Sequence, residues 1–448
     1  MINITDRFLE SLYKMSKREL PANVVEQAKM SIIDYISCTN LGQSMLQEEN
    51  NAYLSNILFE EGKTSIIGAS RKTTVHNALV LNGINAHYVE LDDGHRYGMI
   101  HLGSPIITSM IALAQNHELD ANKFLKGIVI GYEVAIRLAT AIQPGHKLKG
   151  YHATGTCGTI GAAVGMGIVL DYSLEQLKIT LTAAATDAAG ILQVIDDGSK
   201  LKAYNVGRAA VAAMNALYIA KTGLNGPDDV LGGERGFFKV MADAVKEQYL
   251  MEGFKNQYAI ELIYRKPYAA CRHCHAAIEA ALNLKKENEL NVVDVEKIHV
   301  VTYNLAVKGH DHTEIQGTTS AKMSIPYSVA AALLYGKAGY QEYEEEALND
   351  EMLNNLVSRV CVSEEPELSK LVPAKRVAIV NVVTKDGVYE QRVDYPKGEP
   401  ENPISREELE SKYYSLMDAS GKDRIYSKTL LENIWDLENN YKKILDEL

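Results

Sequence analysis

The 448-residue sequence has few cysteines and a shortage of positive charge relative to negative charge. Its five cysteines are an odd, sparse set for this length, which excludes the disulfide framework of a small secreted domain. The net charge of −12 argues against a nucleic-acid-binding surface, which needs a basic face to displace counterions. No apolar run approaches the length of a bilayer span, and residues 1–20 lack the cationic start and apolar core of a signal peptide. We therefore expect a cytoplasmic protein with no nucleic-acid or membrane partner.

The sequence does contain enough apolar residues for a large core. The hydrophobic fraction is 46% and the charged fraction is 23%, both typical of a globular protein. The length exceeds that at which a single core stops growing, so two domains are expected. An acidic protein can still bind an anion, because a few basic side chains in one cleft focus a positive field there.

The first part of the chain has the periodicity and caps of helices. Apolar residues form a helical stripe over residues 24–36. Asp120 can cap a helix over residues 121–142, and Ser173 with Gln176 has the form of a capping box for a helix over 174–195. Small residues are dense over 155–167, which predicts closely packed, buried helices. The glycines of that stretch lack the spacing and the preceding strand of a dinucleotide-binding motif, so NAD and ATP binding are rejected.

The pattern changes after about residue 267. Residues 295–303 predict a strand, and the runs 376–383 and 388–393 flank Lys385-Asp386-Gly387, a turn signal that predicts a hairpin. A helical segment over 327–335 lies between them. We predict a mainly α protein: residues 1–267 and 405–448 form a large helical domain, and residues 268–404 form a smaller α+β lid domain.

Two clusters of polar residues in the helical part could support chemistry. Glu90, Asp92, Asp93 and His101 lie within twelve residues, where glycines suggest that a helix ends. A solvated helix end with charge pairs is an equally good interpretation of this cluster. His152 precedes a helix rich in small residues, where free N–H groups and hydroxyls such as that of Thr154 favour an anion. Capping of the helix by threonine is the structural alternative.

Two further clusters are basic. Lys202 lies in a stretch with Lys200 and Arg208 that would ordinarily be a surface loop, although a lysine can neutralise a carboxylate. The densest polar cluster of the chain contains these residues: Lys266, Tyr268, Cys271, Arg272, His273, Cys274 and His275. Its cysteines and histidines suggest zinc, but the only second ligand pair is His310 with His312, which is a weak match to a zinc site. An anion-binding strip with an imidazole ready for proton transfer is the alternative.

A fifth cluster runs from Ser320 through Lys322 and Ser324 to Tyr327. Tyr327 begins an apolar helix, so packing in the core is the structural interpretation of this tyrosine.

In this order, the clusters resemble the MmgE/PrpD family, which includes 2-methylcitrate dehydratase, cis-aconitate decarboxylase and iminodisuccinate epimerase. The resemblance covers nearly the whole chain and is carried by these motifs: Asn82-Gly-x-x-Ala86-His87, Asp92-Asp93, Gly131-Tyr-Glu133, His152-x-Thr-Gly-Thr156, Lys202-x-x-x-x-Gly207-Arg208, Lys266-Pro-Tyr-x-x-Cys271-Arg272-x-x-His275, Ser324-x-Pro-Tyr327 and Gly398-x-Pro400-x-Asn-Pro403. It implies a helical domain with an α+β lid, an active site between them, a homodimer, and no metal or organic cofactor.

The resemblance also implies which residues form the site. The expected catalytic residues are His101, His152, Lys202, His275 and Tyr327, and the expected substrate-binding residues are Asp92, Asp93, Lys266, Arg272 and Thr154. The chain departs from the family at three positions. Glu90 stands where aspartate is common, Gly94 where threonine is common, and Asn205 where histidine is common.

We therefore expect an enzyme that performs acid–base chemistry next to a carboxylate of a small di- or tricarboxylic acid. Basic side chains would hold the carboxylates, and imidazoles would move the proton. A dehydratase resembling 2-methylcitrate dehydratase is the first expectation, and a decarboxylase or an epimerase of the same family is the alternative. A zinc-dependent hydrolase and a non-catalytic carboxylate-binding protein are the alternatives from other classes.

Overall fold

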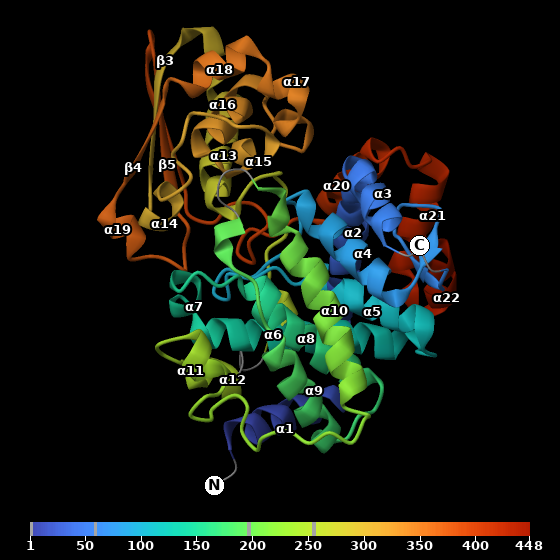
Figure 1. The fold of residues 1–448 in the computed structure, drawn as a ribbon. Helices are drawn as coiled ribbons and strands as arrows, with labels where there is room; N and C mark the ends of the chain where they lie inside the picture. Colours follow the sequence, from blue (N-terminus) through green and yellow to red (C-terminus); the bar gives the residue numbers. More distant parts are fainter. Residues whose placement is uncertain (1–2, 58–60, 195–198, 253–256) are drawn as a thin grey trace. The chain divides into compact units, whose positions relative to one another are not determined.

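The computed structural model describes residues 3–57, 61–194, 199–252 and 257–448 (Figure 1). The chain divides into two compact units. Unit 1 contains the chain up to Val194 together with Leu201–Ile263 and Ser405–Leu448. Unit 2 contains Tyr264–Ile404 and the short segment that ends at Lys200. The fold is mainly α, with a smaller α+β part, as the sequence predicts.

Unit 1 is built almost entirely from helices. In chain order they are α1 (Ile4–Ser16), α2 (Ala22–Met45), α3 (Gln47–Asn56), α4 (Val75–Tyr88), α5 (Gly103–Asn116), α6 (Ala121–Ile142), α7 (Gly145–Leu148), α8 (Ala153–Val169), α9 (Leu174–Thr186), α10 (Tyr204–Ile219), α11 (Phe237–Met241), α12 (Glu247–Met251), α20 (Arg406–Ala419), α21 (Arg424–Trp435) and α22 (Leu437–Glu447). Two short 3-10 turns, η2 (Lys200–Lys202) and η3 (Ala259–Leu262), and the paired strands β1 (Thr64–Ser65) and β2 (Lys72–Thr73) complete the secondary structure of this part.

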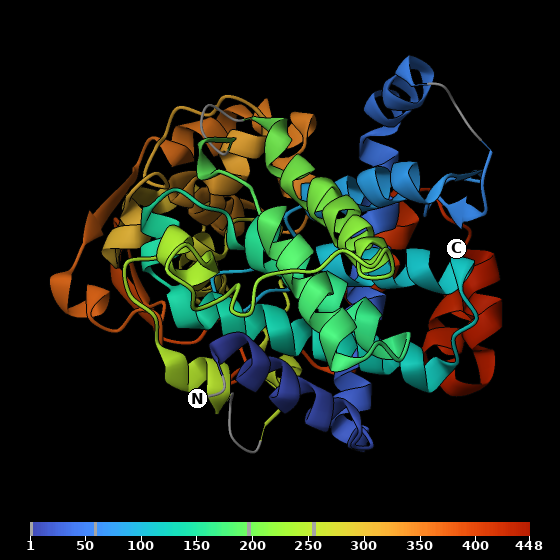
Figure 2. The same cartoon turned by 60° about the horizontal axis from the view of Figure 1, so that its bottom comes forward.

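Helix α8 forms the centre of unit 1, and every residue of it is buried. It packs against α6, α10, α5 and α9, and the green helices of Figure 1 and the turned view of Figure 2 show this arrangement. A Cβ at Gly161 would lie 2.6 Å from the carbonyl oxygen of Gly131 on α6, and one at Gly165 would lie 2.6 Å from that of Gly127. Only glycine allows the two backbones to approach this closely, as the density of small residues predicts. The close packing holds the N-terminus of α8 in a defined place.

Most of the expected helices of unit 1 are confirmed, with one error. Asp120 caps α6 by accepting from the backbone N–H of Lys123, and Ser173 with Gln176 forms the predicted capping box. The helix expected over residues 174–195 is wrong beyond Thr186. The Arg208 guanidinium from α10 donates to the carbonyls of Asp187 (2.8 Å) and Ala189 (2.6 Å), which would otherwise continue the helical hydrogen bonds. The end of that expectation, residue 195, lies outside the described residues.

Unit 2 combines a four-stranded sheet with helices. Its strands are β3 (Val295–Thr302), β4 (Val360–Glu364), β5 (Ala378–Thr384) and β6 (Gly387–Val393), and its helices are α13 (His275–Asn288), α14 (Asn304–Val307), α15 (Thr318–Met323), α16 (Ile325–Tyr335), α17 (Glu345–Leu348), α18 (Glu351–Val357) and α19 (Pro366–Ser369). Short 3-10 turns lie at η4 (Arg272–Cys274), η5 (Val292–Asp294) and η6 (Gln341–Tyr343).

The sheet of unit 2 has the order β4-β3-β5-β6. The predicted hairpin is confirmed: β5 and β6 pair antiparallel, with Thr384 opposite Gly387. Strand β3 is confirmed as well, whereas β4, which pairs with it in parallel, was not expected from the sequence. Helix α13 packs on β5 and β6, and α16 packs on α13, so one face of the sheet is covered (Figure 1). Among the described residues, no helix combines the length and the apolar character that crossing a membrane requires.

Candidate active site

The first part of the candidate site lies where α4 ends. His87 is in the last turn of α4, and the chain leaves the helix at Val89. Glu90 then adopts a left-handed backbone with φ of 59°, and the segment that follows carries Asp92 and His101 before α5 begins. A short antiparallel bridge between His95 and Ile100 closes this segment into a compact loop. The loop returns His101 to the end of α4, next to His87.

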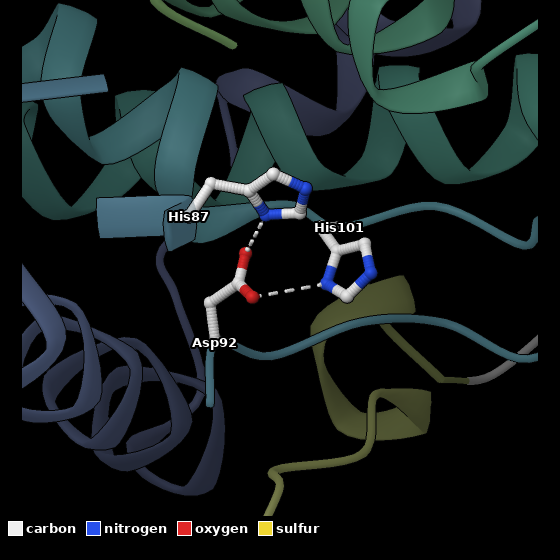
Figure 3. A group of neighbouring side chains, drawn as sticks. All are labelled: His87, Asp92 and His101. Carbon is white, nitrogen blue, oxygen red and sulfur yellow. Dashed lines mark hydrogen bonds and ion pairs between the residues drawn. The ribbon is translucent and has the colours of Figure 1, made fainter. Parts of the chain in front are cut away.

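Asp92 lies between the two imidazoles of this loop, as Figure 3 shows. Its Oδ2 accepts from His87 Nδ1 at 2.7 Å and from the Ser104 hydroxyl, and its Oδ1 lies 3.3 Å from His101 Nδ1. Burial alone would raise the pKa of Asp92, but the neighbouring imidazoles of His101 and His87 outweigh burial, and the pKa lies well below its usual range. Asp92 is therefore a carboxylate at any physiological pH, and it orients both rings.

His87 is a neutral imidazole in this arrangement. It is fully buried, and burial lowers its pKa to about 3 despite the opposing influence of Asp92. Because its Nδ1 faces a carboxylate, the proton of the neutral ring resides on Nδ1. Its Nε2 has no hydrogen-bond partner among the described residues, although it is buried. The ring centroid lies 4.7 Å from that of His101 and 5.8 Å from that of His152, so three imidazoles gather here.

His101 presents a basic nitrogen. Its backbone N–H donates to Thr154 Oγ1 at 3.0 Å, and its Nδ1 lies 2.9 Å from the carbonyl oxygen of Asp93. A carbonyl oxygen can only accept, so Nδ1 of His101 carries a proton and the lone pair of the ring is on Nε2. The His101 side chain is 13% exposed, whereas that of Asp92 is 4% exposed. The carboxylate of Asp92 beside the ring would stabilise the imidazolium that forms when Nε2 takes up a proton.

His152 has the opposite tautomer. It lies at the N-cap of α8, and its backbone N–H donates to the carbonyl oxygen of Gly190 at 3.0 Å. The side-chain amide nitrogen of Asn205 lies 3.3 Å from Nδ1, and an amide NH₂ can only donate, so Nδ1 accepts and the proton is on Nε2. Burial and the nearby His87 and His101 lower the pKa of His152 well below its usual range. His152 is therefore neutral and offers an N–H donor.

Lys202 is the cation next to these imidazoles. It is close enough to His87 to contribute to the lowered pKa of that ring. Its ammonium donates to Glu90 Oε1, and the side chains of Lys202 and Glu90 are 15% and 7% exposed. Lys202, a predicted site residue, is thus paired with Glu90, which lies in the left-handed turn that follows α4.

Asp93 has a structural role in the described arrangement. Its Oδ1 accepts from the backbone N–H of Gly103 (2.9 Å) and Leu102 (3.3 Å), and its Oδ2 accepts from the Tyr132 hydroxyl (2.7 Å). Asp93 thus accepts hydrogen bonds from backbone N–H groups at the start of α5, as carboxylates at helix N-termini commonly do. The predicted role of Asp92 and Asp93 in substrate binding stays a prediction. In this structure both contact Nδ1 of His101, Asp92 through its carboxylate and Asp93 through its backbone carbonyl.

The donor set could also suit a metal ion. Among the described residues, His87, Asp92 and His101 are the ones grouped so that their ligand atoms lie within 4.8 Å of one another. Two imidazoles and one carboxylate are ligands that divalent transition metals accept. However, Nδ1 of each ring faces an oxygen acceptor, and a metal at those nitrogens would displace both protons and both hydrogen bonds. The donor set therefore fits a hydrogen-bonded relay better than a metal centre.

Unit 2 contains the remaining predicted residues. Arg272 pairs with Glu399 at 2.9 Å and donates to Nδ1 of His275 at 2.8 Å. The other nitrogen of His275 lies 3.1 Å from the carbonyl oxygen of Ala270, so both nitrogens of this ring are engaged. Lys266 is buried. These three residues stay predictions for carboxylate binding and proton transfer.

Tyr327 and Lys322 complete the predicted residues of unit 2. The Tyr327 hydroxyl donates to the carbonyl oxygen of Glu342 at 2.9 Å inside the core, which agrees with the packing interpretation of this tyrosine. Lys322 is buried, and burial lowers its pKa to about 8. The cysteines suggested as zinc ligands, Cys271 and Cys274, are not joined in disulfides, and burial raises the pKa of Cys274 well above its usual range. Such a thiol is a poor zinc ligand.

The structure brings five of the predicted residues into one cluster of unit 1: Asp92, His101, His152, Thr154 and Lys202. The sequence analysis missed two members, His87 and Glu90. Both appear in the quoted motifs or clusters, but periodicity assigns His87 to a helix and a charged helix end explains Glu90 equally well.

The chain thus combines a large helical unit that holds a cluster of imidazoles around a buried carboxylate with a smaller α+β unit. Models of the MmgE/PrpD N-terminal domain and of the MmgE/PrpD C-terminal domain match residues 7–249 and 268–437. The chain therefore belongs to the MmgE/PrpD family.

Three relatives illustrate the activities of the family. The chain is 25% identical to the cis-aconitate decarboxylase-like protein oryM of Aspergillus oryzae, over 100% of this chain and 98% of the relative. It is 23% identical to human cis-aconitate decarboxylase, over 92% and 87% of the two chains. It is 26% identical to 2-methylcitrate dehydratase of Salmonella typhimurium, over 51% of this chain and 54% of the relative. Lyases of both kinds are thus among its relatives.

Proposed function

We propose that this chain is a lyase that transfers a proton at a carbon next to a carboxylate of a small di- or tricarboxylic acid. The observation that carries the proposal is the pair of opposite tautomers in one cluster. His101 offers a lone pair on Nε2, and His152 offers a proton on Nε2. A base and a donor in neighbouring positions are what proton transfer at carbon requires.

The first reaction that fits is dehydration. Nε2 of His101 removes the proton from the carbon, and the electron pair delocalises into the adjacent carboxylate as an enolate-like charge. The electrons then form the carbon–carbon double bond as the bond to the hydroxyl group breaks, and the leaving oxygen takes a proton and departs as water. His152, as a neutral donor of the cluster, supplies this proton from Nε2, and the imidazolate that is left regains a proton from the imidazolium of His101.

Decarboxylation is the second candidate, and the relatives favour it. The matches that cover nearly the whole chain are named as cis-aconitate decarboxylases or as similar to one, whereas the dehydratase of Salmonella typhimurium matches about half of the chain. In this reaction the bond to the carboxylate carbon breaks and that carbon leaves as carbon dioxide. The electron pair left on the substrate carbon takes a proton from Nε2 of His152, and the imidazolate that is left regains a proton from water. The same cluster supports both reactions because both build negative charge on carbon.

Proton NMR of the purified enzyme in D₂O tests the proposal and separates the reactions. The panel contains 2-methylcitrate, citrate, cis-aconitate, malate, tartrate and iminodisuccinate. An alkene formed with loss of water identifies a dehydratase, and a product one carbon shorter identifies a decarboxylase. Exchange of a C–H for deuterium with unchanged connectivity identifies an epimerase. If folded enzyme leaves every spectrum unchanged, the proposal is refuted.

A further inference from the structure

We propose that Lys322 and Glu344 form a binding site in unit 2 for a small 2-hydroxy acid. The ammonium of Lys322 binds the carboxylate of the ligand, and Glu344 accepts a hydrogen bond from the hydroxyl group on the neighbouring carbon. Neither residue is among the catalytic or substrate-binding residues that the family resemblance implies. The inference concerns unit 2 alone, so it does not depend on the reaction proposed for the cluster of unit 1.

The packing of short elements in unit 2 brings these two side chains near each other. Helix α15 packs against η6 and against α17. Lys322 lies in the last turn of α15, and Glu344 is the residue between η6 and α17. The backbone N–H of Cys271 donates to the carbonyl oxygen of Lys322 at 2.8 Å, which holds this end of α15 against the segment that follows Lys266.

Lys322 has hydrogen-bonding capacity that the protein does not use. It is 2% exposed, yet its ammonium forms no hydrogen bond or ion pair with any residue that the structure describes. Buried lysines are almost always paired, because an uncompensated charge in the interior is costly. Burial lowers the pKa of Lys322 to about 8, so the side chain is still mainly an ammonium at pH 7. Its N–H donors are therefore available to an anion.

Glu344 offers the complementary acceptor. Its Oε1 is buried and accepts no hydrogen bond from the described part of the chain. Glu344 occupies the N-cap position of α17, but its side chain does not cap that helix. Its charge opposes the fall in the pKa of Lys322 and contributes to the raised pKa of Tyr327, so the carboxylate lies close to both side chains. Helix capping therefore does not account for this glutamate.

The two side chains together define the class of ligand. An ammonium only donates hydrogen bonds and a carboxylate only accepts them, so a group placed between them must accept at one atom and donate at another. A 2-hydroxy acid does so on adjacent carbons, and both hydrogen bonds involve a charged partner, which strengthens them. Lys266 also contributes to the lowered pKa of Lys322, so a second positive charge lies near the proposed carboxylate position. A carboxylate without the hydroxyl would leave Glu344 unbonded and facing a like charge.

The test compares ligands that differ in one hydrogen-bond donor. Glycolate has a carboxylate and a hydroxyl, methoxyacetate replaces the hydroxyl hydrogen by a methyl group, and acetate lacks the oxygen altogether. Dissociation constants are measured by isothermal titration calorimetry on the full chain for the wild type, Lys322→Met and Glu344→Leu. The matched controls are Lys297→Met and Glu296→Leu, because both residues are exposed on β3 of the same unit.

The wild type is expected to bind glycolate at least about tenfold more tightly than acetate or methoxyacetate, which is the effect of one hydrogen bond to a charged group. Lys322→Met should weaken glycolate binding at least about tenfold, because the cation that binds the carboxylate is lost. Glu344→Leu should bind glycolate and acetate within about threefold of each other, because no acceptor remains for the hydroxyl. Both controls should keep the wild-type dissociation constants.

Thermal melts separate a binding role of Lys322 from a structural one. Methionine fills a similar space without burying an unbonded charge, so Lys322→Met should melt at or above the wild-type temperature. A lower melting temperature, or a variant that does not fold, would make Lys322 a structural residue and overturn the inference.

The inference is also overturned if the wild type does not distinguish glycolate from acetate, or if Lys322→Met binds glycolate as tightly as the wild type. Failure of the proposed function has a different signature. An enzyme that binds glycolate through Lys322 but leaves every compound of the NMR panel unchanged would refute the lyase proposal alone.

Discussion

Replacement of Asp92 by asparagine removes the negative charge between the imidazoles of His87 and His101 with almost no change in the shape of the side chain. Asp92 Oδ1 lies 3.3 Å from Nδ1 of His101, the ring that we propose as the base. After proton transfer that ring is an imidazolium, and a unit charge at 3.3 Å stabilises it by about 5 kcal/mol at an effective dielectric constant of about 20. The carbonyl oxygen of Asp93, at 2.9 Å from the same nitrogen, remains in the variant and compensates in part.

We therefore expect Asp92→Asn to lower kcat by about 10²- to 10³-fold, which corresponds to about 3–4 kcal/mol in the barrier. KM should change little, because Asp92 presents no positive group to the substrate. The assay is turnover followed by NMR over a range of pH, with succinate binding measured in parallel. Loss of the charge should also shift the basic group of the pH profile to lower pH, which a merely structural role would not do.

The matched control is Asp120→Asn, because Asp120 is exposed at the N-cap of α6 and asparagine caps equally well. Its kcat should equal that of the wild type. If Asp92→Asn folds and keeps more than about a tenth of wild-type kcat, Asp92 does not stabilise a charged His101 in the reaction.

Three further predictions concern the same cluster. His152→Ala should reduce turnover at least about 10²-fold with an unchanged thermal melt, whereas the exposed His76→Ala should have no effect; near wild-type activity would exclude His152 as the proton donor. The folded-state pKa of His87 lies at about 3, below its ordinary value of about 6.5, so its contribution to stability is present above pH 6.5 and is lost as the pH falls toward 3. Between pH 6.0 and 4.5, urea unfolding should therefore show the wild type losing about 2 kcal/mol more than His87→Asn, and equal losses would mean that the ring is already protonated or accessible. Dialysis against EDTA should leave kcat within about twofold, while a loss that zinc restores would instead assign a metal to His87, Asp92 and His101.

The parts of the fold that the sequence predicts are those determined by local rules. Helix α6 begins at a capping aspartate and carries a helical apolar pattern, and the β5–β6 hairpin turns at Lys385-Asp386, directly before Gly387. Each of these signals lies within about ten residues. The packing of distant residues therefore changes the bounds of these elements little.

The predictions of secondary structure are wrong or incomplete where residues distant in the sequence determine the local structure. Helix α9 ends at Thr186 because Arg208, on α10, takes the carbonyls that would continue it. Strand β4 pairs in parallel with β3, so Ile298 lies opposite Val360 after a long connection. Two parallel strands are not joined by a tight turn that the sequence could reveal, because the connection must return from one end of the sheet to the other.

In the candidate site, the sequence predicts which residue types gather but not what each does. The sequence does not distinguish the tautomer of His101 from that of His152. The choice between proton acceptor and proton donor depends on the hydrogen-bond partners of each ring. The decisive contacts are a backbone carbonyl, that of Asp93, and a side-chain amide, that of Asn205. His87 was missed because nothing in a helical stretch distinguishes a core histidine from one bonded to a buried carboxylate.

Three imidazoles of the same intrinsic basicity thus differ in where the proton and the lone pair lie, because a different group contacts Nδ1 of each ring. Full burial keeps His87 neutral despite the neighbouring carboxylate, and its Nδ1 proton is donated to Asp92. A carbonyl oxygen that accepts from Nδ1 leaves the lone pair of His101 on Nε2. An amide that donates to Nδ1 leaves the proton of His152 on Nε2. Under the proposed function one ring accepts a proton and another supplies it, so what distinguishes dehydration from decarboxylation is the group that leaves the substrate.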